Sequence, residues 1–191
     1  MGDVMVDEKK NELKKIKILS VVGFFVISII GTILHFAFEF SGNNLVVATF
    51  SAVNESVWEH LKIAVMPVFL WTIIELFVLK YRPDNLWTSV LAKIATNMFL
   101  IVILYYISLF VLGTHNSKVA IGIFYVSILV SQIVGYIVIN MKKVDAKIEE
   151  VTKYSVLFIF LLFIFFTFLP PKAEIFKDEI TQTYGVFELE Y

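Results

Sequence analysis

The sequence predicts an all-α membrane protein: a bundle of five transmembrane helices with a short re-entrant segment between the first two. Hydrophobic residues make up 59% of the 191 residues, and the mean hydropathy is +0.83. Five apolar runs reach the roughly 20 residues that a helix needs to cross the hydrocarbon layer. A sixth apolar run, Leu45–Val53, has less than half of that length and is expected to re-enter the membrane surface.

These runs divide the chain into three parts. We expect a charged N-terminal segment at 1–15, a transmembrane domain at 16–169 and a C-terminal tail at 170–191. The expected spans are 16–38, 57–80, 87–112, 118–141 and 152–169, with the re-entrant segment at 44–54. The first apolar run exceeds the roughly 7–15 residues of a signal peptide, so we interpret it as a retained span.

Composition excludes several classes of function. The chain has no cysteine, which excludes disulfides, thiolate metal sites and a cysteine nucleophile. Arg82 is the only arginine, and no basic stripe with interleaved aromatic residues suggests nucleic-acid binding.

The distribution of basic residues predicts the orientation in the membrane. With the N-terminus inside the cell, the basic residues concentrate in the inner loops, as membrane insertion favours. The inner set is Lys9, Lys10, Lys14, Lys15, Lys17, Lys80, Arg82, Lys142, Lys143, Lys147 and Lys153, and the outer set is Lys62, Lys118, Lys172 and Lys177. We therefore expect the N-terminus inside and the C-terminus outside a cell membrane.

The densest polar chemistry lies at the outer ends of the first two spans. His35 and Glu39 share one helix face near the end of span one, and Glu55, Glu59 and His60 lie at the start of span two. The pattern suggests one divalent metal, with zinc as the best match, and His35, His60 and Glu39 as ligands. Glu55 or Glu59 would then activate a water molecule.

Two other interpretations use the same residues. Without a metal, the patch would be a proton relay or a cation-binding pocket. Alternatively Asn54, Glu55 and Glu59 would only cap a helix start, with Trp58 as an interfacial anchor.

Two further features lie within or beside the spans. Glu75 on span two and Lys93 on span three have matching depths, which predicts an intramembrane ion pair. Pro67 is expected to bend span two near the polar patch. The tail, which follows a Pro-Pro pair, either packs over the bundle as a lid that adds Asp178 to the site or is disordered.

The chain resembles a family of small bacterial membrane proteins described only as a domain of unknown function. The resemblance rests on His35, the motif Asn54-Glu55-Ser56-x-Trp58-Glu59-His60, Pro170-Pro171 after the last span, and Tyr184-Gly185. It covers nearly the whole chain and implies the bacterial cytoplasmic membrane, but no activity.

Three functions fit these observations. The first is a metal-dependent hydrolase or transferase that acts at the outer leaflet on a lipid or a small molecule. The second is a non-enzymatic subunit for binding or transport of an ion or small molecule. The third is an accessory membrane protein whose polar groups only set helix packing.

Overall fold

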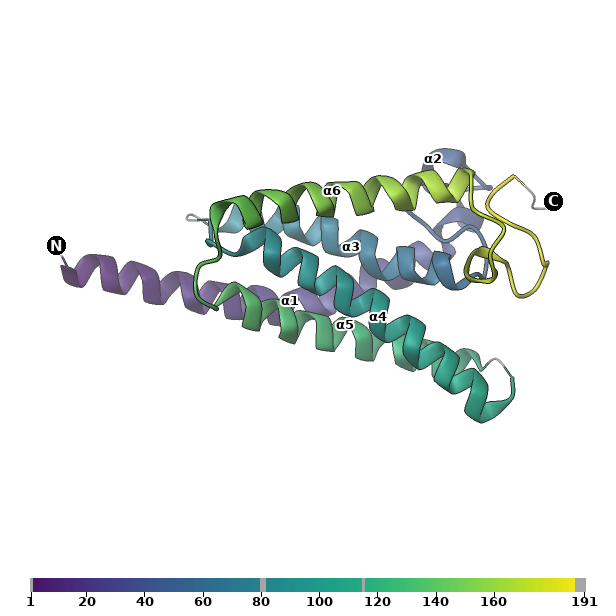
Figure 1. Cartoon of the computed structure of the whole chain (residues 1–191), viewed down its shortest axis with the longest axis horizontal. Helices are drawn as coiled ribbons and strands as arrows, with labels where there is room; N and C mark the ends of the chain where they lie inside the picture. Colours follow the sequence, from purple (N-terminus) through teal and green to yellow (C-terminus); the bar gives the residue numbers. More distant parts are fainter. Residues whose placement is uncertain (1, 80–81, 115, 188–191) are drawn as a thin grey trace.

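The computed structural model describes residues 2–79, 82–114 and 116–187, with side chains described from Asn11 onward. Five helices in this part have the length and apolar composition to cross a membrane (Figure 1). The elements are α1 (Gly2–Phe40), α2 (Leu45–Ala48), α3 (Val57–Val78), α4 (Leu86–Leu112), α5 (Ser117–Ile139), α6 (Ala146–Phe168) and the 3-10 helix η1 (Glu174–Phe176). The predicted all-α bundle of five spans is confirmed.

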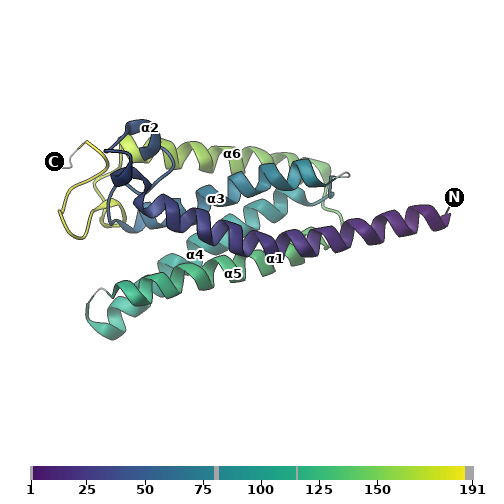
Figure 2. The ribbon, with the colours of Figure 1, turned by 180° about the vertical axis from the view of Figure 1, so that it is seen from behind.

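The helices run up and down between two ends of the bundle, and the chain termini lie at opposite ends (Figure 1). The N-terminus and the connections α3–α4 and α5–α6 lie at one end. The α2 segment, the α4–α5 connection and the C-terminal tail lie at the other, which we call the site end. Toward the site end, α4 and α5 run together and diverge from α6 (Figures 1 and 2).

Two helices begin earlier than the apolar runs suggest. The charged N-terminal segment continues α1 without a break, and an i,i+3 pair joins Lys15 to Glu12 at 2.7 Å. Helix α6 begins six residues before the expected start, where Asp145 accepts a hydrogen bond from the Lys147 amide at 2.8 Å. Both extensions contain charged residues, so hydropathy alone does not mark them.

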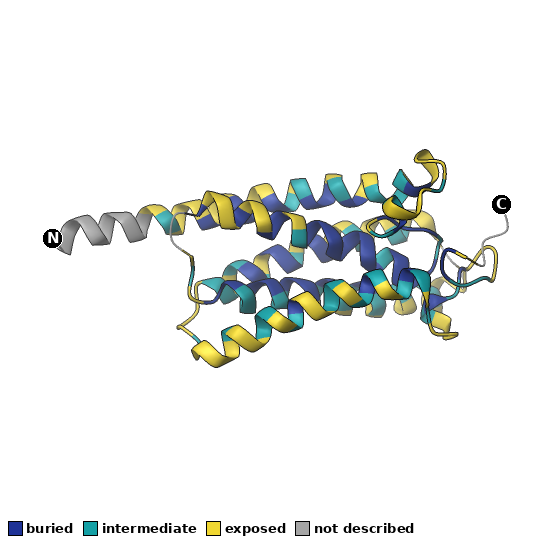
Figure 3. Ribbon diagram, turned by 90° about the horizontal axis from the view of Figure 1, so that it is seen from above, coloured by how far each residue is buried: buried dark blue, intermediate teal, exposed yellow. Residues whose placement is uncertain are grey.

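Helix α3 forms the centre of the bundle. Its buried side chains, such as Leu61, Val65 and Val68, pack against residues from other helices, such as Ile94 and Ile128. Buried residues lie along the inside of the bundle, and exposed ones lie outside (Figure 3). Many exposed side chains are large and apolar, including Phe77, Phe99 and Phe110. This surface suits contact with lipid rather than water.

Buried polar groups join the helices far from the site end. Lys93 donates hydrogen bonds to both carboxylate oxygens of Glu75, at 2.9 and 3.2 Å, and both residues are almost fully buried. Ser89, one turn before Lys93, donates to the carbonyl of Gly135 on α5 at 2.9 Å. The pair expected from matching depths thus lies in the interface between α3, α4 and α5.

Residues 44–54 turn back at the site end. Asn44 caps α2, which is a single turn, and the Ala52 amide then donates to the Leu34 carbonyl on α1 at 3.2 Å. Ala48 is fully buried. The segment therefore packs into the bundle, and its depth in a bilayer stays a prediction.

The C-terminal tail folds back onto the site end. Phe176 and Val186 are buried, and an isolated antiparallel bridge joins Lys177 to Tyr184. The Val186 amide donates to the Thr167 carbonyl on α6 at 3.2 Å. The described part of the tail covers the bundle, as the lid interpretation expects.

Candidate functional site

A close approach of α1 and α3 sets up the site. Pro67 has no amide hydrogen, so the Ile63 carbonyl has no helical partner at that position. Gly31 lies beside this carbonyl: a Cβ atom on Gly31 would lie 2.6 Å from the Ile63 oxygen. The two backbones can approach this closely only because Gly31 lacks a side chain. His35 follows Gly31 by one turn and His60 precedes Ile63, so the contact brings the two imidazoles together.

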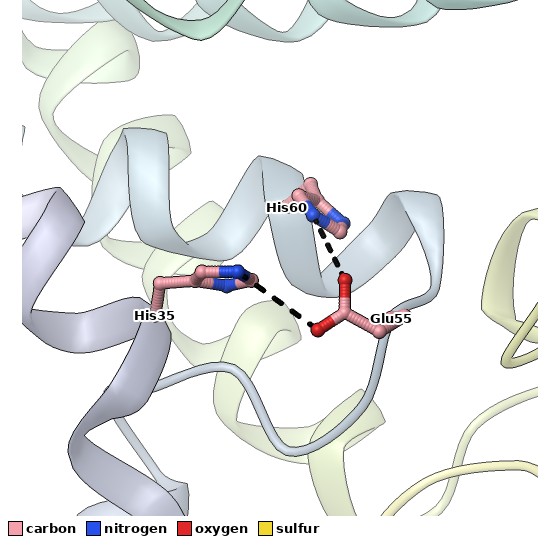
Figure 4. A group of neighbouring side chains, drawn as sticks. All are labelled: His35, Glu55 and His60. Atoms are coloured by element: carbon pink, nitrogen blue, oxygen red, sulfur yellow. Dashed lines mark ion pairs between the residues drawn. The ribbon is translucent and has the colours of Figure 1, made fainter. Parts of the chain in front are cut away.

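Three side chains converge at this point: His35 from α1, His60 from α3 and Glu55 from the loop before α3 (Figure 4). One carboxylate oxygen of Glu55 lies 3.9 Å from His35 Nε2, and the other lies 3.5 Å from His60 Nε2. The imidazole ring centroids are 5.4 Å apart. One ligand atom from each residue lies within 4.8 Å of the others, a spacing that could hold a metal ion.

The start of α3 fixes the orientation of His60. Ser56 is the N-cap residue, and its hydroxyl accepts a hydrogen bond from the Glu59 amide at 3.3 Å. His60 Nδ1 lies 2.9 Å from the Ser56 carbonyl oxygen. A carbonyl can only accept, so Nδ1 carries the hydrogen, and in the neutral ring Nε2 presents its lone pair toward Glu55. Metal-binding histidines are commonly oriented by such a bond.

The cluster opens to the outside of the bundle. The Glu55 side chain is 42% exposed, and those of His35 and His60 are 26% and 27% exposed. An opening of about 450 Å³, which we call the polar opening, is lined by His35, Glu55, Glu39, Asn54 and Asp178 among others. Glu39 therefore lies near the cluster but is not one of the three converging groups. The carboxylate that lies beside both imidazoles is thus that of Glu55, not that of Glu39 as the sequence suggests.

Glu59 does not face the cluster. Its carboxylate is buried in an ion pair with Lys62 one turn later, and it accepts a hydrogen bond from the Val53 amide at 3.1 Å. Lys62 Nζ also donates to the Ala48 carbonyl at 3.0 Å and to Thr167 Oγ1 on α6 at 2.8 Å. The expected role of Glu59 as a water-activating base thus gives way to a structural one.

Trp58 also has a structural role, in aromatic packing. It stacks on Phe163 of α6, with ring centroids 4.5 Å apart, and contacts Phe176 of the tail at 4.7 Å. It is 9% exposed. The expected interfacial anchor is therefore a buried aromatic contact that joins α3, α6 and the tail.

Asn54 and Asp178 line the polar opening but also stabilise local turns. The Asn54 side-chain oxygen accepts from the Ser56 amide at 3.0 Å, which shapes the loop before α3. The two Asp178 oxygens accept from the Ile180 amide at 2.9 Å and from the Thr181 hydroxyl at 2.6 Å. The Asp178 carboxylate is thus used within the tail.

Glu179 is the site neighbour that the sequence did not single out. Partial burial raises the pKa of Glu179 above its ordinary value; nearby His60 lowers this pKa, and Glu55 raises it. These effects place its carboxylate within electrostatic range of two members of the cluster. Because only the folding of the tail brings Glu179 near the cluster, its position next to Asp178 is the one feature of the sequence that points to it.

A family model for a family of unknown function, DUF6512, matches residues 5–186. No curated protein and no solved structure matches the chain. The chain therefore belongs to DUF6512, which confirms the predicted membership of a family without assigned function.

Proposed function

We propose that this member of DUF6512 binds one divalent metal through His35, His60 and Glu55 and uses it for hydrolysis or group transfer at a membrane surface. The observation that carries the proposal is the convergence of three ligand atoms within 4.8 Å. Two histidines and one glutamate form a ligand set of catalytic zinc sites, which leave a fourth position for water. The fixed orientation of His60 supports the same assignment.

The chemistry would be activation of water by the metal. A bound zinc ion would lower the pKa of its water ligand to about 7, close to neutral pH. The activated water would add its oxygen to the carbonyl carbon or phosphorus of an ester, the ester bond would break, and a proton would go to the departing oxygen. Glu55 would be occupied as a ligand and Glu59 as an ion-pair partner, so Glu39, which lines the same polar opening, is the carboxylate that would carry this proton.

The orientation inferred from the basic residues would put this reaction outside the cell. Among the described residues, Arg82 and the inner lysines other than Lys80 belong to the end opposite the site, and cytoplasmic loops are the ones enriched in basic residues. The site end would then face the outer leaflet of the cell membrane. A hydrolase or transferase acting on that leaflet follows from the orientation and the metal set together.

Metal analysis of the purified protein tests the proposal. We expect stoichiometric zinc, or zinc binding after its addition, in the wild type. His35→Ala, His60→Ala and Glu55→Gln should lose the metal and keep, to within a few degrees, the unfolding temperature of the metal-free wild type in detergent. Glu39→Gln is the matched control, because Glu39 lines the same opening outside the converging group.

Two outcomes would reject the metal site. One is a wild type that binds no divalent metal; the other is a His35→Ala variant that binds it as tightly as the wild type. A second candidate function, reversible binding of a cation or proton without chemistry, rests on the exposure of Glu55 between the two imidazoles. Bound metal that never activates water toward any ester would favour this second function.

A further inference from the structure

A groove follows the contact between α1 and α5 on the outside of the bundle. The two helices lie side by side (Figures 1 and 2). The groove has room of about 400 Å³ and is lined mainly by apolar and aromatic side chains, such as Val21, Phe25, Leu129 and Ile133. We call it the α1/α5 groove. None of the three residues of the histidine cluster lines it, so it is separate from the candidate metal site.

The directions of the two helices decide which residues share an end of the groove. Helix α1 ends at the site end and α5 begins there, so the two helices run antiparallel. They meet at Gly23, where a Cβ atom would lie 3.1 Å from the side-chain oxygen of Gln132. Lys17 precedes Gly23 and Tyr136 follows Gln132, so both lie at the end of the groove opposite the site end. From Lys17 to Phe25 the groove follows α1 for roughly 12 Å.

Lys17 gives this end of the groove a positive charge. It is exposed, and it is the only charged residue among the described residues that line the groove. No described side chain pairs with its ammonium group. The sequence has no Asp, Glu, Lys or Arg from position 18 to 38, so Lys17 stands where the apolar run begins. Tyr136 lines the same end, and tyrosine is typical of the boundary between hydrocarbon and water.

A phospholipid matches this combination of charge and apolar surface. Val21, Phe25 and Ile133 are exposed apolar residues, and hydrocarbon rather than water surrounds such residues in a membrane. An acyl chain can follow the groove while the phosphate reaches the ammonium group of Lys17. Lipid chains are all about as apolar as the groove, so the apolar lining distinguishes poorly between them. The lysine therefore supplies the preference, which is for a headgroup with net negative charge.

We propose that the α1/α5 groove binds one phospholipid with an anionic headgroup. Its phosphate contacts Lys17, and one acyl chain lies along Val21, Phe25 and Ile133. The lipid holds α1 against α5 at the end of the bundle opposite the histidine cluster. With the orientation inferred from the basic residues, the lipid would come from the cytoplasmic leaflet, which is the anionic one. The choice of headgroup rests on Lys17 and depends neither on this orientation nor on the proposed metal.

Lys17→Gln tests the headgroup. Dioleoyl-phosphatidylglycerol and dioleoyl-phosphatidylcholine differ in net charge but not in their chains; each is titrated into purified protein in detergent, and native mass spectrometry counts the bound lipid. The wild type should bind the glycerol lipid about fivefold more tightly, as expected for one lysine beside an anionic lipid. Lys17→Gln should remove this preference. The matched control, Lys147→Gln, removes an exposed lysine in the first turn of α6 and should keep the preference.

Ile133→Trp tests the position of the chain, because a larger side chain there would occupy the groove. The matched control is Ile137→Trp, one turn further along α5, where the side chain is 55% exposed and does not line the groove. Ile133→Trp should lose saturable binding of both lipids, and Ile137→Trp should keep it. Leu129→Trp is a second substitution in the groove in case the first variant does not fold. Glycerophosphoglycerol, which has the headgroup but no chains, should not bind.

Three results would overturn the proposal. An equal preference for the glycerol lipid in the wild type and Lys17→Gln would overturn the headgroup assignment. Equal lipid binding by Ile133→Trp and the wild type, or binding of glycerophosphoglycerol, would overturn the position of the chain. A wild type without saturable lipid, together with a changed oligomeric state of Ile133→Trp, would show that a second copy of the chain covers the groove instead.

Discussion

Replacement of Lys62 by methionine should strongly destabilise the site end. The Lys62 side chain is fully buried, and its ammonium group pairs with Glu59 and donates to the Ala48 carbonyl and the Thr167 hydroxyl. Lys62→Met keeps the length of the side chain but leaves the Glu59 carboxylate buried without its cation. Removing one partner of a buried pair costs about 3–5 kcal/mol.

A second substitution checks that charge is the cause. Adding Glu59→Gln to Lys62→Met should recover most of the loss, because the amide keeps an oxygen facing the Val53 amide but carries no charge. Thr167→Val alone should cost only about 1 kcal/mol, the typical net value of one hydrogen bond.

The assay is reversible unfolding by SDS in mixed micelles, followed by tryptophan fluorescence. Trp58, packed between α6 and the tail, reports on the site end. The matched control is Lys118→Met, because Lys118 is an exposed lysine in the first turn of α5. Two results would exclude an unpaired buried charge as the cause: Lys62→Met unfolding no more easily than Lys118→Met, or a double variant less stable than Lys62→Met alone.

Two further predictions concern the helix contacts. Gly31→Ala should separate α1 from α3 and lower zinc affinity about 10–100-fold, as the loss of groups that orient metal ligands does, although no ligand is changed. Zinc titration measures this loss. The control is Gly122→Ala, whose Cβ would meet nothing within 4 Å and which should leave zinc affinity unchanged. Glu75→Gln leaves Lys93 buried without its anion and should cost about 3–5 kcal/mol of stability in the same unfolding assay. Adding Lys93→Met should recover most of this stability. If the stability losses of the two substitutions simply added, the two residues would not be a coupled pair.

The sequence predicted those features that depend on hydropathy and on position along a helix. Apolar runs predicted the five spans, and matching depth predicted the contact of Glu75 with Lys93. The same reasoning placed His35, Glu55 and His60 in one region, because span one ends and span two begins at the same side. Each of these inferences needs only the helix rise and the membrane thickness.

The division of roles among the carboxylates could not be read from the sequence. Glu55 and Glu59 share a helix face only if both lie on the helix, but Ser56 caps α3 and leaves Glu55 in the preceding loop. Glu59 turns inward because the segment from Ala48 to Val53 folds over α3 and needs polar partners there. These facts depend on the path of the loop, which hydropathy does not report.

The bonds of Lys62 also have a consequence for biogenesis. A membrane protein is synthesised from its N-terminus, so residues 48–62 are made long before Thr167. Until the last span has been inserted, the Lys62 ammonium lacks the Thr167 hydroxyl as a hydrogen-bond acceptor, and Trp58 lacks Phe163 as a stacking partner. The packing around Lys62 and Trp58 is therefore complete only on nearly finished chains, whereas the contact of Gly31 with Ile63 that brings the two imidazoles together needs only the first two spans.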